Sequence, residues 1–308
     1  MVTPGECAPL PSEVAPVEAD QRLRLADGRE LAYNFYGDPE GEPVIYFHGF
    51  PGSWLEAGMS QPEAARLGLC LVAPDRPGIG LSTPQAGRPL CDWPGDVREL
   101  ADALRWDQFR VLGFSGGAPY ALACAAFLPE RISRVAVVAG MAPLANPNGT
   151  RGMGMLGRLL LVLARYWPFA GRLLLRGAAA AAMRDPQELP PGFAAGLPPA
   201  DRAVLRRAWL SRLLRASLGE SFRQGFAGNQ QDLALLARPW GLRLTDIATS
   251  VSLCHGEADA IVPATMGRYL ASRLPRCYAT FLPGEGHFSL AINRAEIILE
   301  ALKEERSQ

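Results

Sequence analysis

Short apolar blocks alternate with longer mixed blocks over the first half of this chain. Four of the apolar blocks have the length of a strand, and apolar runs of that length are typical of strands buried on both faces. They are residues 43–48, 69–73, 109–112 and 133–139. Helix patterns lie between them, at 61–67 and 96–106, and at 118–128, which is almost wholly apolar. This alternation predicts a parallel sheet with helices on both faces, the α/β fold class.

The two ends of the chain complete this pattern. Near the N-terminus, residues 22–25 and 30–36 predict a hairpin across the turn Ala26-Asp27-Gly28. Near the C-terminus, strand and helix patterns alternate again at 250–255, 263–274, 276–282 and 287–303. Residues 1–20 hold several prolines and four acidic residues but no basic one, which predicts a flexible or loosely attached tail.

A long helical segment interrupts the α/β pattern. From 146 to 246 the sequence predicts helices only, punctuated by proline and glycine. Because strand patterns both precede and follow this segment, it is an insertion rather than a terminal domain. We therefore predict a core formed by 21–145 and 247–308, with an inserted helical unit at 146–246.

Positive charge is concentrated in the insertion, although the whole chain is neutral and so has no global field that favours nucleic acid. Residues 151–223 hold twelve arginines and four acidic residues. Arg158, Arg165 and Arg172 recur every seven residues, as on one polar stripe of a helix. One interpretation is a set of helices with a solvated basic face. The other is a lid whose leucine-rich face lines an acyl pocket and whose basic face attracts an anionic substrate or membrane surface.

Cysteine usage and hydropathy bear on the cellular compartment in which the protein works. The six cysteines are scattered, without CxxC spacing or a Cys/His cluster, so no structural zinc site is expected. The chemistry predicted below implies no metal or organic cofactor. Several of the cysteines lie in apolar strand-like runs, as buried free thiols do, which favours a reducing, cytoplasmic setting. The N-terminus lacks a signal-peptide pattern, and no apolar run is long enough to predict a transmembrane helix.

One pentapeptide carries the strongest chemical signal: Gly113-Phe114-Ser115-Gly116-Gly117. It joins a predicted strand to a predicted helix, and Gly-x-Ser-x-Gly in that position is the pattern of a nucleophile elbow. The serine must sit on a sharp, strained turn, so Gly113 and Gly117 supply small neighbours. The following helix directs its N-terminal N–H groups towards the reacting centre. Ser115 is therefore the candidate nucleophile; a glycine-rich turn with a surface serine is the alternative.

Five motifs, in their order along the chain, resemble the α/β-hydrolase superfamily. They are His48-Gly49, Asp75-Arg76-Pro77-Gly78-Ile79-Gly80-Leu81-Ser82, the pentapeptide around Ser115, His255-Gly256-Glu257-Ala258-Asp259 and Gly284-Glu285-Gly286-His287. The resemblance spans roughly residues 21–305 and implies a mostly parallel central sheet with an all-helical cap at the insertion. It also implies that the loop starting at Asp75 is structural rather than catalytic.

A serine nucleophile needs a base, and the chain has three histidines. The resemblance implies a structural role for His48, and His255 ends a predicted strand in the segment that carries the acid. His287 follows a strand, opens the last helix pattern and comes after the acid, as the Ser…Asp…His order of this fold requires. We therefore predict His287 as the base, with a helix-capping histidine as the alternative.

The candidate acid is Asp259, which would hold the imidazole tautomer and stabilise the imidazolium. It lies four residues beyond the strand that ends at His255. Glu257 is the nearby competitor, and Asp246 precedes the same strand. A helix-capping role is the alternative for Asp259.

An oxyanion needs two N–H donors. The resemblance implies the backbone N–H groups of Gly116 and of Phe50, the residue after His48-Gly49. A local observation agrees, because Pro51 has no N–H and confines Phe50 to extended geometry, which orients the Phe50 N–H. An ordinary Pro-Gly turn after Phe50 is the alternative.

These residues predict a serine hydrolase, most specifically a carboxylic-ester hydrolase of the esterase or lipase kind. Its partner would be a small acyl ester, apolar or anionic, with medium or long acyl chains preferred and with peripheral contact to anionic membranes. Its kcat/KM should rise with pH through a transition near about 6.5. A ligand receptor or scaffold without turnover, a C–C hydrolase and a cofactor-free perhydrolase are the alternatives on the same fold.

The tetrad His48-Gly49-Phe50-Pro51 bears on two further subgroups. It resembles the H-G-x-P of epoxide hydrolases and dehalogenases, but those relatives need an aspartate where Ser115 stands. Proline iminopeptidases carry a glycine where Phe50 stands, and the insertion shows no acidic cluster that would hold a substrate amine. The sequence therefore disfavours both chemistries.

Overall fold

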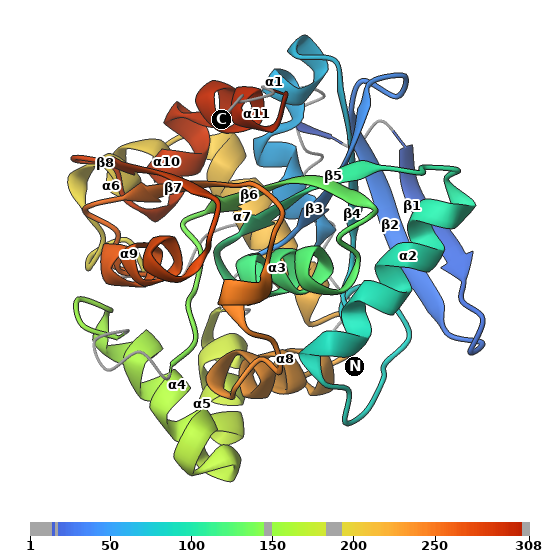
Figure 1. Cartoon of the computed structure of the whole chain (residues 1–308). Coiled ribbons are helices and arrows are strands. Elements are labelled where there is room, and N and C mark those ends of the chain that lie inside the picture. Colours follow the sequence, from blue (N-terminus) through green and yellow to red (C-terminus); the bar gives the residue numbers. More distant parts are fainter. Residues whose placement is uncertain (1–13, 16–17, 145–149, 183–192, 304–308) are drawn as a thin grey trace.

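The computed structural model of the chain describes residues 14–15, 18–144, 150–182 and 193–303. In these ranges, eight strands form one sheet in the order β1-β2-β4-β3-β5-β6-β7-β8 (Figure 1). The strands are β1 (Glu18–Arg24), β2 (Glu30–Gly37), β3 (Glu42–Phe47), β4 (Leu69–Pro74), β5 (Phe109–Phe114), β6 (Ile132–Val138), β7 (Val251–Gly256) and β8 (Cys277–Leu282). The pairs β1–β2 and β2–β4 are antiparallel, and every other pair is parallel. The predicted α/β class is confirmed.

Two helical layers cover the sheet, one on each face (Figure 1). One layer contains α2 (Trp93–Ala103), α3 (Ala118–Phe127) and α9 (Ala264–Arg273), and the other contains α1 (Gln61–Arg66), α10 (His287–Asn293) and α11 (Ala295–Lys303). Successive side chains of a strand point to opposite faces. In β3, Ile45 and Phe47 therefore pack in one apolar cluster, while Val44 and Tyr46 pack in the other. Burial on both faces explains why the central strands are apolar without interruption.

Helix α2 begins and ends three residues earlier than the predicted 96–106, and two further elements differ from the sequence prediction. β1 begins at Glu18 rather than at Arg22, so its first residues fall within the predicted tail, most of which lies outside the described residues. The last predicted helix is two helices, because Arg294 leaves helical geometry at φ −123°. The Arg294 guanidinium reaches back to Glu285, with 3.0 Å between Nε and Oε1. No proline or glycine lies within four residues of Arg294, so the sequence carries no signal for this break.

Every regular element that the structure describes in the insertion between β6 and β7 is a helix or a 3₁₀ turn. The insertion contains α4 (Met155–Tyr166), α5 (Pro168–Ala182), α6 (Pro199–Leu205), α7 (Ala208–Ser221), α8 (Ala227–Ala237) and a 3₁₀ turn (Leu244–Asp246). Helix α6 packs on α10, α7 packs on the 3₁₀ turn η2 (Trp54–Met59), and α4 packs on α8. Figure 1 shows α4 and α5 as a hairpin that projects from the body of the molecule. No described helix is long and apolar enough to cross a membrane.

The parallel strands bring the predicted site residues to one edge of the sheet. Ser115 follows β5, Asp259 follows β7, and His287 follows β8. Phe50 lies in the loop after β3, which pairs with β5 in parallel. Since the carboxyl ends of parallel strands share one edge, which is where open α/β sheets bind ligands, we turn to this edge for the site.

Candidate active site

Ser115 lies on a strained turn between β5 and α3. Its φ is +54°, a left-handed conformation that non-glycine residues seldom adopt, and its side chain is buried. A Cβ at Gly113 would lie 2.7 Å from the Ala118 Cα, and a Cβ at Gly117 would overlap the Phe47 carbonyl oxygen. The chain approaches itself too closely here for any residue but glycine. These contacts give the pentapeptide the geometry that its pattern predicts for a nucleophile elbow.

His287 and Asp259 form a buried pair at the same edge of the sheet. The His287 Nδ1 lies 2.7 Å from the Asp259 Oδ2. The other carboxylate oxygen, Oδ1, accepts the backbone N–H groups of Ile261 and Val262, at 2.8 Å each, which fixes the carboxylate. The imidazole also packs against Phe114, the residue before Ser115, with 5.0 Å between ring centroids. Asp259 therefore orients His287 beside the serine turn.

The electrostatics of His287 favour its charged form. Burial opposes the charge on the imidazole, but the charge and hydrogen bond of Asp259 outweigh it, with further support from Asp201 and Glu56. The net effect raises the pKa of His287 above its ordinary value. A base that is fixed by a carboxylate through Nδ1 keeps its other nitrogen available for proton transfer.

The competing acids lie elsewhere. Glu257 is paired with Arg268, with 2.6 Å between Oε1 and Nη2. Asp246 is paired with Arg243 in an exposed turn, with 2.8 Å between Oδ2 and Nε. Neither carboxylate has the contact with His287 that Asp259 has.

The other two histidines are buried and have a lowered pKa. Burial is the main cause for both. The His255 Nε2 lies 2.8 Å from the Val262 carbonyl oxygen, and the His48 Nδ1 lies 3.0 Å from the Gly49 carbonyl oxygen. Both rings are thus committed to the backbone of loops next to the site.

The loop that contains Phe50 lies directly against the serine turn. A Cβ at Gly116 would lie 3.1 Å from the Phe50 backbone nitrogen, and a Cβ at Gly49 would lie 3.3 Å from the Ser115 Cβ. The two predicted oxyanion donors, the N–H groups of Phe50 and Gly116, therefore come from adjacent stretches of backbone. On the insertion side, Leu236 of α8 comes within 3.5 Å of the same Gly116 position. Helix α8 thus covers this part of the site with an apolar side chain.

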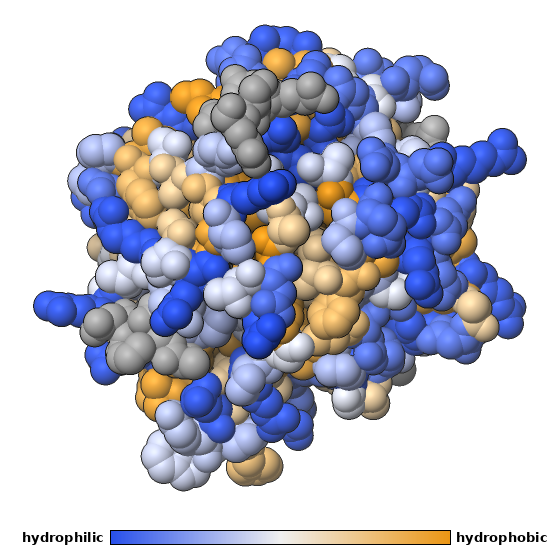
Figure 2. Space-filling view, viewed as in Figure 1, coloured by the Kyte–Doolittle hydropathy of each residue, from blue (hydrophilic) through white to orange (hydrophobic). Residues whose placement is uncertain are grey.

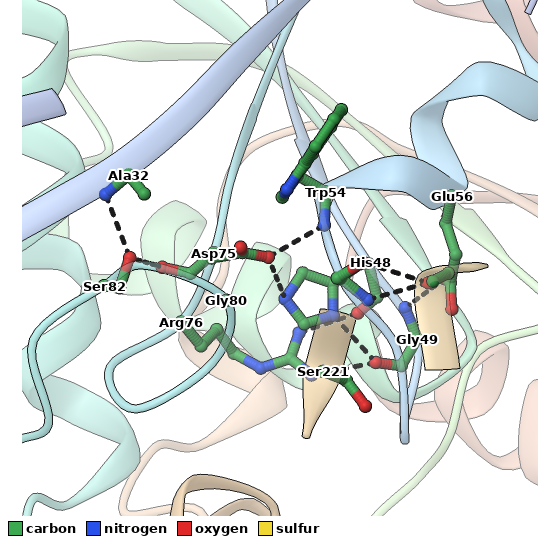
Figure 3. Close-up of polar contacts among 12 residues, drawn as sticks. Ala32, His48, Gly49, Trp54, Glu56, Asp75, Arg76, Gly80, Ser82 and Ser221 are labelled. Atoms are coloured by element: carbon green, nitrogen blue, oxygen red, sulfur yellow. Dashed lines mark hydrogen bonds and ion pairs between the residues drawn. The ribbon is translucent and has the colours of Figure 1, made fainter. Parts of the chain in front are cut away.

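The side chains of Arg76 and Glu56 hold the backbone immediately before Phe50 (Figure 3). Arg76 donates to the carbonyl oxygens of His48 and Gly49, at 2.7 and 2.8 Å. The Gly49 N–H donates to Oε2 of Glu56 at 2.6 Å. Burial raises the pKa of Glu56 to about 7, against the opposing effects of the Gly49 hydrogen bond and of Arg76. The candidate oxyanion loop is therefore fixed through both its N–H and its C=O groups.

Asp232 of α8 anchors Arg76 from the insertion. Its carboxylate binds Arg76 Nε at 2.6 Å and Arg88 Nη2 at 2.5 Å, and it accepts the Tyr120 hydroxyl at 2.9 Å. All three partners belong to the core, and Asp232 is fully buried. Burial alone would raise the pKa of Asp232, but the two arginines outweigh it, so the pKa is lowered.

Asp201 of α6 makes a second buried link from the insertion. It accepts the backbone N–H groups of His287, Phe288 and Ser289, at 2.9, 3.0 and 2.8 Å. These N–H groups begin α10 and have no partner within that helix. Asp201 thus caps the helix that starts at the candidate base, although it lies 86 residues earlier in the chain.

Sequence reasoning missed Glu56, Arg76, Asp201 and Asp232. One signal was available for Asp232, which lies three and four residues from Leu235 and Leu236, on the apolar stripe of a predicted helix. An acidic residue at such a position needs a buried partner. Asp201 gave no such signal, because its partners are backbone groups of a distant segment.

The described ranges contain no group of three or more His, Cys, Asp or Glu residues placed to hold a metal ion. The polar groups at the site are instead a hydroxyl, an imidazole, carboxylates and backbone N–H groups. Such groups are the components of nucleophilic acyl chemistry.

Fold and site together define a class: α/β proteins with a serine elbow, a later Asp–His pair and a helical insertion beside them. A family model described as "alpha/beta hydrolase fold" matches residues 42–293. This match covers well over half of the chain, so the protein belongs to the alpha/beta hydrolase fold family. The family resemblance inferred from the five motifs is confirmed.

Curated relatives match over part of the chain only. A proline iminopeptidase of Xylella fastidiosa is 34% identical over 129 residues, which is 40% of this chain and 40% of that protein. A proline iminopeptidase of Neisseria gonorrhoeae is 27% identical over 151 residues, or 47% of each chain. The chain thus spans less than half the length of these relatives.

Solved structures match over nearly the whole chain at low identity. An esterase from Exiguobacterium antarcticum has a TM-score of 0.65 at 16% identity and covers 92% of this chain and 100% of its own. An enol-lactonase from Burkholderia xenovorans LB400 has a TM-score of 0.66 at 20% identity, with the same coverage. At this identity the likeness shows the fold alone.

Proposed function

We propose that this protein is a serine hydrolase that cleaves carboxylic esters. The observation that carries the proposal is the 2.7 Å contact between His287 Nδ1 and Asp259 Oδ2, beside the strained turn of Ser115. An imidazole that a buried carboxylate fixes in one tautomer is the base that an otherwise unreactive serine hydroxyl requires.

In the proposed reaction, Ser115 attacks the acyl carbonyl while His287 takes the hydroxyl proton at Nε2. The N–H groups of Phe50 and Gly116 bind the oxyanion that develops on the carbonyl oxygen. His287 then gives its proton to the leaving alkoxide, which leaves an acyl group on Ser115. Water, deprotonated by His287, attacks this acyl-enzyme and releases the acid. Asp259 stabilises the imidazolium in both half-reactions.

The substrate side of the proposal is an apolar acyl group. Leu236 of α8 is fully buried and packs on the backbone at Gly116, so the surroundings of the candidate oxyanion donors are apolar on this side. Each methylene that becomes buried contributes about 0.8 kcal/mol, so medium chains should be preferred to acetate. A p-nitrophenyl ester series from acetate to decanoate tests this preference. A maximum of kcat/KM at acetate would contradict it.

A second candidate is the release of an N-terminal residue, because the matched curated relatives are proline iminopeptidases. Two observations disfavour it. Phe50 stands where that subgroup carries a glycine. In addition, three acidic residues of the insertion that the structure describes already have partners within the protein. Asp201 binds backbone N–H groups, Asp232 binds arginines, and Glu220 pairs with Arg223.

Parallel assays with a p-nitrophenyl ester and with proline p-nitroanilide distinguish the candidates. We expect steady turnover of the ester, little release of nitroaniline, and loss of the ester activity in Ser115→Ala. Greater kcat/KM for the anilide would reverse the order of the two candidates. A single stoichiometric burst without turnover would indicate a receptor rather than an enzyme.

We further propose a reducing, cytoplasmic setting. Among the described residues, Cys70, Cys91, Cys124, Cys254 and Cys277 are all free thiols. Burial raises the pKa of Cys124 well above its ordinary value, so its thiol is protonated and inert. Free thiols without disulfides are typical of proteins in reducing compartments.

A further inference from the structure

The hairpin of α4 and α5, residues 155–182, exposes an unusual amount of apolar surface. Seven of its large apolar side chains are exposed, against three in the rest of the described chain. The seven are Met155, Leu156, Leu159, Tyr166, Trp167, Phe169 and Leu173. Met155 is 86% exposed and Phe169 is 81% exposed. A concentration of this kind marks an interaction site more often than a random surface.

These exposed side chains are distributed along the hairpin, from Met155 at the start of α4, through Trp167 at the turn, to Leu173 in α5. The buried residues Leu161 and Ala164 of α4 belong to the same apolar core cluster as Leu233 and Leu236 of α8. The exposed set occupies other positions of α4 and the turn into α5. Figure 2, viewed as in Figure 1, shows apolar and strongly hydrophilic side chains side by side at this end of the molecule. One face of the hairpin therefore packs on the rest of the protein, and the other is exposed.

The charged residues within the hairpin's own segment are all positive. Five arginines occur in and just before the hairpin, and no acidic residue occurs between positions 151 and 184. The arginines are Arg151, Arg158, Arg165, Arg172 and Arg176. A second copy of the chain docked on the same face would bring two such sets together and would be repelled. The charge therefore favours a partner that is both apolar and anionic.

We propose that the α4–α5 hairpin docks on the surface of an anionic lipid bilayer. Tyr166, Trp167 and Phe169 at the turn would enter the interface between headgroups and acyl chains, where aromatic side chains are enriched. The exposed arginines Arg158 and Arg172 would contact the anionic headgroups, whereas Arg165 is half-buried and donates to the Ala237 carbonyl oxygen at 3.2 Å. The hairpin lies on the surface, since no described helix is long and apolar enough to span a bilayer. This proposal does not depend on the chemistry of Ser115.

The test is cosedimentation of the full chain with vesicles. One set contains phosphatidylcholine alone, and the other contains phosphatidylcholine and phosphatidylglycerol in equal parts. We expect binding to the anionic set only. The binding should weaken as salt rises from about 0.01 M to about 1 M, because the screening length falls from about 30 Å to about 3 Å.

Two variants separate the contributions of charge and apolar surface. Arg158→Gln with Arg172→Gln should weaken binding to the anionic vesicles about thirtyfold at low salt, since each basic residue near such a surface contributes about a factor of five. Trp167→Ser with Phe169→Ser should weaken it at least about tenfold, through lost apolar contact. All four side chains are exposed, so both variants should unfold like the wild type.

Matched control variants lie on other helices and strands. Arg24→Gln with Arg98→Gln removes two exposed arginines outside the insertion, and Phe127→Ser removes an exposed aromatic of α3. Both should bind vesicles like the wild type. Equal binding to neutral and anionic vesicles, no binding to either, or hairpin variants that bind like the wild type would each overturn the proposal. Sedimentation velocity adds one more outcome: a dimer that Trp167→Ser disrupts, without vesicle binding, would make the surface a self-association site.

Discussion

The helical insertion has two halves that meet the core in different ways. The α6–α8 half sends two fully buried carboxylates, Asp201 and Asp232, into contact with the backbone and the arginines that surround the site. The turn between α7 and α8 adds Gln224, which donates to the carbonyl oxygens of Gly80 and Ser82 at 2.9 Å. The α4–α5 half instead exposes most of its large apolar side chains.

This contrast indicates two roles for one insertion. Buried polar groups must be paired. The core therefore keeps its geometry around the site only while α6–α8 remain packed on it. Asp201 binds the backbone of the candidate base, His287. Asp232 binds Arg76, which holds the loop that carries Phe50. Among the described residues of the α4–α5 half, no buried carboxylate links the hairpin to the core, and its composition suits contact with a partner. We therefore expect changes in the first half to alter turnover, and changes in the second to alter localisation on lipid.

The largest effect should come from the core itself. Ser115→Ala should lower ester kcat by several orders of magnitude and leave unfolding unchanged, because it removes only the nucleophile. In the same assay with a dissolved substrate, Trp167→Ser with Phe169→Ser should keep kcat within about twofold of the wild type, as exposed substitutions do. Steady-state kinetics measures both. If Ser115→Ala kept more than about a tenth of the wild-type kcat, the assignment of Ser115, His287 and Asp259 as a catalytic triad would be wrong.

The next effect should be on stability. Asp232→Ala leaves Arg76 and Arg88 buried without their carboxylate, and breaking a buried pair in this way costs about 3–5 kcal/mol of unfolding free energy. Leu173→Ala on the exposed hairpin should cost less than about 0.5 kcal/mol. Urea unfolding measures the two values, and similar values would contradict the distinction between the two halves.

The same carboxylate should give the stability a pH dependence. The pKa of Asp232 is lowered in the folded state, so its contribution is present above the unfolded value of about 3.9 and is lost as pH falls below it, through the folded pKa. Asp232→Ala should therefore reduce the loss of stability on acidification. An unchanged acid limb would mean that the pKa of Asp232 is the same in the folded and unfolded states, which would contradict the stabilisation of its charge by the two arginines.

A smaller effect on turnover should follow from Asp201→Asn. The neutral amide keeps one acceptor oxygen but removes the charge, so α10 and the His287 ring at its start should shift slightly. Misplacement of this kind lowers kcat up to about a hundredfold. Because the Asp201 charge helps to raise the pKa of His287, the pH transition of kcat/KM should also move to lower pH. A fall in kcat without that movement would assign Asp201 a purely structural role.

The smallest expected change is a displacement of the pH profile. Only neutral His287 can accept the Ser115 proton, so kcat/KM should rise with pH through the His287 pKa. That pKa is raised, so the transition should lie above about 6.5, higher than the sequence alone suggests. Glu56→Gln keeps an acceptor for the Gly49 N–H but removes a nearby charge, and should move the transition to lower pH. A profile that is flat from about pH 5 to 9 would contradict the general-base role.

Much of the fold was predictable because its signals are local. Uninterrupted apolar runs gave the buried strands, and their alternation with helix patterns gave a parallel sheet. The Ser115 pentapeptide required glycines on both sides, and the structure shows the close contacts that exclude a side chain there. The order of Ser115, Asp259 and His287 along the chain limited the base to one of three histidines.

The support of the site was not predictable, because it depends on contacts between distant segments. Glu56 lies in a short 3₁₀ turn without a motif, yet it binds the backbone of Gly49. Asp201 contributes to the site through backbone N–H groups, which every residue except proline carries and which therefore leave no trace in a sequence.

The most direct test of the central claim is to label the nucleophile and measure turnover in the same sample. A fluorophosphonate should react once per chain, and peptide mass spectrometry should place the adduct on Ser115. Ester turnover should fall in proportion to the labelled fraction. His287→Ala should suppress the labelling, because the hydroxyl then lacks its base. An adduct on another residue, or turnover that survives complete labelling of Ser115, would contradict the account.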